Sequence, residues 1–389
     1  MTSKSSALHF VILMGVVSLF ADVTYEGARS ITGPYLDFLG ASAAIVGFVA
    51  GFGEFLGYGM RLISGYFSDR TGRYWPIAII GYIVNLAAVP LLALTGHWWI
   101  AGLLIILERA GKGIRVPVRD AMLSHAAQRI GMGWGFGLHE ALDQVGAMTG
   151  PLLVALVLFL QGNYRNSFAI LLIPALAAIL SLLICRWLYS NPKAMEEEPQ
   201  RIELIVLRKN KAFWLYLAGA SLVALGYTDF ALIAYHFSKA HLLAPLWIPI
   251  SYAVALGANI IMAPLLGHLY DRKGFVVLIV ITFIASFFPL FAFLGSGMNI
   301  FFGVLLWGVG LGAQGSLMRA IVGEMISKDK RATTYGIFNS IFGFAWFIGS
   351  AAMGILYDVS IPALIVFSLL AQWLSLPILW RAMHLLKRR

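Results

Sequence analysis

The side chains in this sequence that could do chemistry are charged groups placed inside long apolar runs. Glu108, Lys112, Arg115 and Arg119 follow one another at spacings of four, three and four residues, which places them on one face of a helix. An ionisable group inside a bilayer costs at least about 2.5 kcal/mol, so it usually faces a polar cavity or a partner charge. We expect this face to border a polar path.

Several carboxyl groups in the same runs could carry protons. Burial favours the neutral form of a carboxyl group, which allows it to bind and release a proton during a functional cycle. For each of them, a purely structural ion pair with a nearby cation, such as Arg29 or Arg61, is an equally open interpretation. The candidates are Asp22, Glu26, Glu54 and Asp143.

A second group of polar side chains could contact a small solute. Arginine and lysine in a dry environment pair well with carboxylate or phosphate. His139 and Asp143 lie one helical turn apart, but this segment is not the His-Glu-x-x-His motif, so we expect no metal site. The candidates are Arg109, Lys112, Arg115, His139, Glu140, Asp229 and Asn339, with the aromatic residues Tyr227, Tyr235, Phe338, Phe342 and Trp346 beside them in the second half.

The elements that must position these groups are membrane-spanning helices. Of the 389 residues, 60% are hydrophobic and only 12% are charged, and apolar runs of bilayer length recur along the chain. The net charge of +10 is scattered over short loops, so no nucleic-acid partner is expected. The sequence predicts an all-α integral membrane protein with helices over 9–37, 42–67, 74–95, 98–121, 132–160, 166–189, 212–238, 246–269, 275–295, 298–324, 332–357 and 361–383.

The distribution of basic residues predicts the orientation in the membrane. The even-numbered loops and the termini contain most of the lysine and arginine, including Arg70, Arg73 and Lys209, whereas the opposite loops hold Arg165 and Lys239. Positive loops remain on the cytoplasmic side. Both termini are therefore expected in the cytoplasm, with the protein in the cytoplasmic (inner) membrane.

An internal repeat divides the chain into two halves. The segment from Gly65 to Arg73 has a weaker copy from Gly267 to Gly274, 202 residues later, at the equivalent place in the order of helices. A polar segment lies between the halves. We expect six-helix bundles at 1–190 and 212–389, joined by a cytoplasmic linker at 191–211.

The first copy of the repeat resembles the loop signature of the major facilitator superfamily. In that family the signature is associated with a latch that closes in one transport state, and the matching residues are Gly65, Asp69, Arg70, Gly72, Arg73, Asp271 and Arg272. Arg109 followed by Gly113 resembles the helix-four signature of the family. Gly146, Gly150 and Pro151 resemble the signature of its drug:proton antiporter branch, although Leu152 and Leu153 replace the glycine pair that should follow.

The resemblance implies a secondary active transporter that moves a small organic solute by alternating access, with proton-coupled efflux as the leading function. Asp143 or Asp22 would carry the proton, and Arg109 would be its charge partner. Uptake or exchange of an anionic metabolite and lipid flipping remain alternatives. We expect no enzymatic activity and no cofactor beyond the proton gradient as energy source, a small-molecule substrate and the lipid bilayer as partners, and a monomer.

Overall fold

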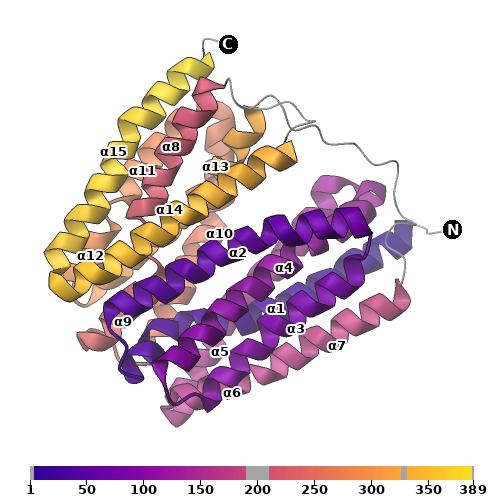
Figure 1. Ribbon diagram of the computed structural model, residues 1–389, viewed down its shortest axis with the longest axis horizontal. Helices are drawn as coiled ribbons and strands as arrows, with labels where there is room; N and C mark the ends of the chain where they lie inside the picture. The colour runs from indigo at the N-terminus through magenta and orange to yellow at the C-terminus, as the bar shows by residue number, and fades with distance from the viewer. Residues whose placement is uncertain (1–3, 190–209, 326–330, 388–389) are drawn as a thin grey trace. The chain divides into compact units, whose positions relative to one another are not determined.

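The computed structural model describes residues 4–189, 210–325 and 331–387, and these residues form long helices joined by short connections (Figure 1). The first half contains α1 (Lys4–Phe38), α2 (Ala43–Thr71), α3 (Tyr74–Leu91), η1 (Leu92–Leu94), α4 (Trp98–Ile130), α5 (Met132–Gln161), α6 (Tyr164–Ile170) and α7 (Leu172–Leu188). The second contains α8 (Lys211–Gly226), α9 (Phe230–Lys239), α10 (Trp247–Lys273), α11 (Val276–Ala285), α12 (Phe288–Leu294), α13 (Met298–Glu324), α14 (Arg331–Val359) and α15 (Ile361–Lys387).

These helices confirm the predicted set of twelve spans. Within the described ranges, eleven continuous or briefly interrupted helices are long and apolar enough to cross a membrane. The twelfth span is α4, which fails that criterion because its middle holds six charged residues from Glu108 to Asp120. The prediction that this helix ends at residue 121 is wrong, since α4 continues to Ile130.

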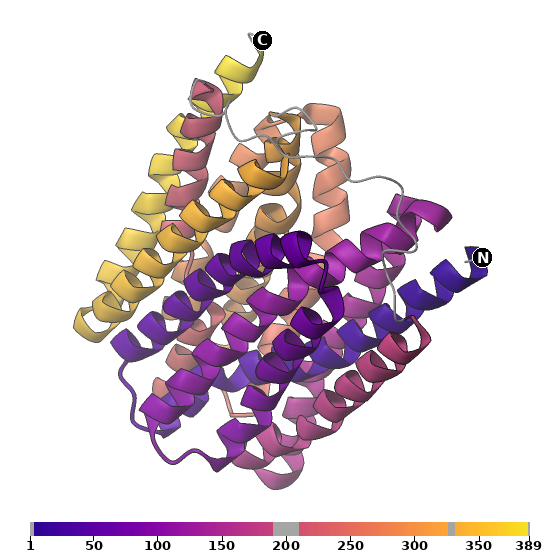
Figure 2. The same ribbon diagram turned by 45° about the vertical axis from the view of Figure 1, so that its right-hand side comes forward.

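The chain forms two compact units. The first is built from the described residues of Met1–Leu39, Leu56–Pro199 and Pro245–Ile250, and the second from those of Gly40–Phe55, Gln200–Ala244 and Ser251–Arg389. The predicted linker at 191–211 lies almost entirely outside the described residues. Both ribbon views show α1, α3, α4 and α5 running alongside one another within the first unit (Figure 2).

Glycines allow the helices of the first unit to approach closely. A Cβ atom on Gly146 or Gly150 of α5 would overlap the backbone of Leu19 or Val23 on α1. On α4, a Cβ on Gly111 would overlap the backbone of Asn85 on α3. Backbone contact of this kind is the usual way in which small residues pack membrane helices. It brings the polar side chains of α1, α3, α4 and α5 within reach of one another.

The second unit contains an interruption that was not predicted. The helix expected over 212–238 is broken between α8 and α9 at Tyr227, Thr228 and Asp229. Other helices satisfy the carbonyl groups that the break releases: Ser368 Oγ donates to Gly226 O at 2.5 Å, and Trp307 Nε1 donates to Thr228 O at 2.9 Å. The break is therefore stabilised by tertiary hydrogen bonds, as is required in a span without water.

The repeat is visible in the backbone of both units. Gly72, which follows α2, and Gly274, which follows α10, have φ angles of +64° and +68°. Their amide groups donate to Ser68 O at 2.8 Å and to Tyr270 O at 2.6 Å. A left-handed residue at this place closes the last helical turn and favours glycine. Both copies of the repeat therefore end a helix in the same way.

Candidate functional site

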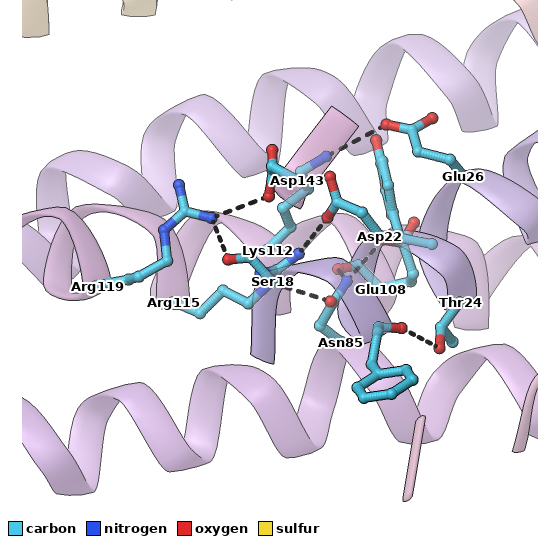
Figure 3. Close-up of polar contacts among 12 residues, drawn as sticks. Ser18, Asp22, Thr24, Glu26, Asn85, Glu108, Lys112, Arg115, Arg119 and Asp143 are labelled. Carbon is cyan, nitrogen blue, oxygen red and sulfur yellow. Dashed lines mark hydrogen bonds and ion pairs between the residues drawn. The ribbon is translucent and has the colours of Figure 1, made fainter. Parts of the chain in front are cut away.

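The charged face of α4 lies inside the first unit, where it meets α1, α3 and α5 (Figure 3). At its centre, Arg115 Nη2 donates to Asp22 Oδ1 at 3.2 Å, and the two side chains are 0% and 7% exposed. Arg115 Nε donates to Asn85 Oδ1 at 3.1 Å, and the guanidinium carbon lies 4.7 Å from the centre of the Tyr82 ring. The arginine is therefore held by a carboxylate, an amide and an aromatic face.

Asn85 connects this ion pair to a second one. Its Nδ2 donates to both the backbone oxygen and the Oε1 atom of Glu108, at 2.9 and 2.7 Å. Glu108 Oε2 in turn lies 3.4 Å from Arg109 Nε. Arg109 also donates through Nη1 to the Tyr25 hydroxyl group on α1. A continuous chain of polar contacts thus joins Asp22 to Tyr25 through α3 and α4.

Lys112 forms a third contact between α4 and α1. Its Nζ atom lies 3.6 Å from Glu26 Oε1 and 3.4 Å from the centre of the Tyr25 ring. Its side chain is 21% exposed, more than the buried Arg115. Lys112 is therefore more accessible to a solute than the central cation of this face.

Arg119, nearer the end of α4, binds α5 and α1. Its Nη1 atom donates to Ser18 Oγ at 3.0 Å and lies 3.7 Å from Asp143 Oδ1. Its other nitrogens contact Asp120 Oδ1 at 2.9 Å. Ser18 Oγ is also 2.9 Å from His139 Nε2. Asp143 and His139 thus meet through Arg119 and Ser18, and among the described residues no group of His, Cys, Asp and Glu could hold a metal ion.

The pairing of acids and bases differs in one respect from the sequence prediction. Arg109 was expected to be the charge partner of Asp22 or Asp143, but those carboxylates pair with Arg115 and Arg119. The reason is the helical step of about 100° per residue, which turns Arg109 away from the face of Arg115 and toward Tyr25. The expected charged face itself is present.

The remaining candidates are Glu54, Glu140, Asp229 and Asn339. Glu54 belongs to the part of α2 that is assigned to the second unit. Glu140 is exposed and accepts a hydrogen bond from Gln144 Nε2 at 2.7 Å on its own helix. Asp229 is buried and caps α9 by accepting from the Ala231 amide at 2.9 Å, whereas Asn339 is half-buried on α14.

The predicted latch is described only in part. Arg70 is exposed, and its Nη1 donates to the Tyr66 hydroxyl at 2.9 Å, whereas Arg73 follows α2 and Gly65 lies within it. Asp271 and Arg272 are exposed at the end of α10. The side chain of Asp69 lies outside the described residues, so the latch stays a prediction.

Five residues of the network were missed in the sequence: Ser18, Tyr25, Tyr82, Asn85 and Asp120. Asn85 offered a signal, because it is the one amide in the apolar helix α3 and membrane spans rarely contain an amide without a partner. Serine and tyrosine are common in apolar runs. Their types alone gave no reason to select Ser18, Tyr25 or Tyr82.

Two helix bundles related by an internal repeat, with ionisable groups buried among apolar helices, are typical of a secondary transporter. The family model of the Major Facilitator Superfamily matches residues 10–350, and the chain belongs to this family.

Relatives and solved structures agree with this assignment. The chain is 40% identical to an uncharacterized protein of Mycobacterium tuberculosis over 95% of this chain and 92% of the relative. It is 28% identical to an uncharacterized MFS-type transporter of Methanocaldococcus jannaschii over 90% and 89%. A crystal structure of the nucleoside transporter NupG superposes with a TM-score of 0.74 over 97% of this chain and 99% of that one, at 15% identity. At 15% identity, the similarity to the NupG structure shows a shared fold only.

Proposed function

We propose that this protein is a proton-coupled secondary transporter of a small organic solute and that Asp22 is the group that binds the proton. The observation that supports this proposal most directly is the Asp22–Arg115 ion pair, which joins α1 to α4 in the interior of the first unit. Protonation of Asp22 would remove its charge and release Arg115. A single proton could thus change the contact between two transmembrane helices.

Asp22 is favoured over Asp143 by its surroundings. The Asp22 side chain is 7% exposed and its partner is fully buried, whereas the Asp143 side chain is 18% exposed and lies 3.7 Å from Arg119. Arg119 also has Asp120 as a second acidic partner at 2.9 Å. Loss of the charge on Asp143 therefore leaves Arg119 paired. Loss of the charge on Asp22 leaves Arg115 against a neutral amide and a neutral ring.

Export is the direction that we propose, because Gly146, Gly150 and Pro151 resemble the antiporter signature and the two glycines occupy the contact between α5 and α1. Uptake of an anion is a weaker proposal, since Lys112 and Arg115 already have acidic partners on α1. We further propose that both termini are cytoplasmic, that one chain suffices for transport, and that no catalytic step is involved.

The test uses full-length protein in liposomes with a pH-sensitive dye inside. Organic carboxylates, lipophilic cations and neutral heterocycles are added in turn, and a coupled solute is recognised by the pH change that it causes. We expect Asp22→Asn to abolish that pH change while exchange of labelled for unlabelled solute continues. Asp37→Asn on the same helix is the matched control. Full proton coupling in Asp22→Asn, or loss only in Asp143→Asn, would refute the assignment of Asp22.

A further inference from the structure

Six residues of the second unit have a buried polar atom without a hydrogen-bond partner within the described part of the protein, and two of them, Gln314 and Trp346, have an amide or an indole N–H group. Both amide atoms of Gln314 on α13 are inaccessible and unpartnered, and so is Nε1 of Trp346 on α14, whose residue is 5% exposed. Nearly all buried polar groups in folded proteins have a partner. A bound ligand is one way in which an amide and an indole N–H so placed become satisfied.

Gln314 lies between two fixed points on α13. Tyr227 donates from its hydroxyl group to Trp307 O, and Tyr216 donates to Met318 O at 2.9 Å. Trp307, Gln314 and Met318 are seven and four residues apart, so they share one face of the helix. Gln314 therefore lies, along α13, between the places where Tyr227 and Tyr216 contact this helix.

An aromatic column on α14 connects the same two tyrosines. Tyr216 stacks on Phe338 with 6.0 Å between ring centres, Phe338 stacks on Phe342 at 5.6 Å, and Phe342 contacts Trp346 at 6.0 Å. Trp346 then contacts Tyr227 at 5.5 Å. The α13 face and the α14 column thus form two sides of a frame that the tyrosines close at both ends, and all of these side chains are neutral.

We propose that this frame binds the solute and that the solute is a neutral planar heterocycle with a hydrogen-bond donor beside an acceptor on one edge, as in a pyrimidine, a purine or a lactam. The side-chain amide of Gln314 offers one acceptor and a pair of donor hydrogens, which matches such an edge with two hydrogen bonds. The aromatic column borders the frame with neutral rings against which a flat ring can pack, and Trp346 Nε1 offers one further donor. This inference rests on the proposed transport function only for the role of the ligand as the transported solute.

The frame distinguishes this class of ligand from others. A carboxylate or phosphate would bring a full negative charge to a site whose named groups supply no cation. A purely aliphatic molecule would leave the Gln314 amide and the Trp346 N–H unpartnered, which penalises its binding. Rings without a polar edge would pack against Phe338 and Phe342 but would also leave the Gln314 amide and the Trp346 N–H unpartnered. A flat ring with an amide-like edge satisfies both requirements at once.

Binding is tested on full-length protein in detergent by calorimetry with uracil, adenine and 2-pyridone. Their N-methylated counterparts and toluene are the matched compounds without the edge. The variants are Gln314→Met and Trp346→Phe, and the control is Trp373→Phe, whose indole donates to Ser286 Oγ at 3.0 Å and is half-exposed on α15. Thermal melting without ligand identifies any variant that fails to fold, and each site variant is interpreted by itself.

We expect at least one of the three rings to bind, its N-methylated form to bind about tenfold more weakly, and Gln314→Met to weaken binding by about tenfold or more. Trp346→Phe should weaken it severalfold, and Trp373→Phe should not change it. No binding of any ring, equal binding of the N-methylated forms, or unchanged binding in both site variants would overturn the proposal. If the solutes that move protons lack such an edge, this inference fails and the proposed function stands. If the rings bind but cause no coupled proton movement, the binding site stands and the proposed proton-coupled function fails.

Discussion

Arg115 on α4 and Asp22 on α1 are separated by 93 residues in the chain and by 3.2 Å between Nη2 and Oδ1. Neither side chain can be neutralised without leaving the other charge in an apolar interior. A buried ion pair of this kind adds little net stability, because desolvation offsets the attraction between the charges. If Asp22 binds the proton, as we propose, the strength of this contact depends on the protonation of its carboxyl group.

Replacement of Asp22 by Asn should separate proton coupling from solute movement. Asparagine keeps the size of the side chain but cannot carry the proton, so a pH gradient should no longer drive accumulation. Solute exchange at equal pH on both sides should continue at a rate within a few-fold of the wild type. Liposome transport assays with and without a pH gradient measure the two rates, and equal loss of both would indicate a folding defect.

A double-mutant cycle should reveal the dependence of Asp22 on Arg115. Arg115→Gln leaves the carboxylate buried and unpaired, and we expect a loss of about 3–5 kcal/mol in the free energy of unfolding. In the double variant Asp22→Asn, Arg115→Gln no charge remains, so the loss should be smaller than the sum of the single losses. Unfolding in detergent, followed by tryptophan fluorescence, provides the measurement. Strict additivity would show that the two groups do not interact.

The contact between α1 and α5 should not tolerate even one methyl group. A Cβ at Gly146 would overlap the backbone oxygen of Leu19, which a rotamer change cannot relieve. We expect Gly146→Ala to cost about 1–3 kcal/mol through overpacking. Gly59→Ala on α2 is the matched control, because a Cβ there meets nothing within 4 Å. The melting temperatures of the two variants give the comparison, and equal values would contradict the packing.

The orientation in the membrane can be tested with few substitutions. The chain contains one cysteine, Cys185, which is buried and should not react. Arg165→Cys, at an exposed position, should react with a membrane-impermeant maleimide added to intact cells, whereas Lys4→Cys should react only after permeabilisation. The opposite pattern would place both termini outside the cytoplasm.

The sequence predicted the spans and the charged face of α4 because both depend on local periodicity. The runs were long enough to define twelve helices, and the spacing of Glu108, Lys112, Arg115 and Arg119 required one face. The pairing of these cations could not be predicted, since it depends on how closely α1, α3 and α5 approach α4. That approach is set by glycines whose contacts become visible only in three dimensions.

The interruption between α8 and α9 was missed for a related reason. No proline marks it, and Tyr227, Thr228 and Asp229 lie in an otherwise apolar run. The break is stabilised by Trp307 and Ser368, which are far away in the chain. Gln314 was also missed, because a single glutamine in an apolar helix gives no periodic signal.

The charge content of α4 also has a consequence for biogenesis. A charged residue near the middle of a span costs about 2.5–3.5 kcal/mol on insertion scales, and α4 holds six between Glu108 and Asp120. We therefore expect that this helix does not pass from the translocon into lipid by itself. Its charges need the partners Asp22 on α1, Asn85 on α3 and Asp143 on α5. We expect α4 to insert together with these three helices, of which α1 and α3 precede it in the chain and α5 follows it. On this argument, we expect the first half of the chain to assemble as a group before the second half is complete.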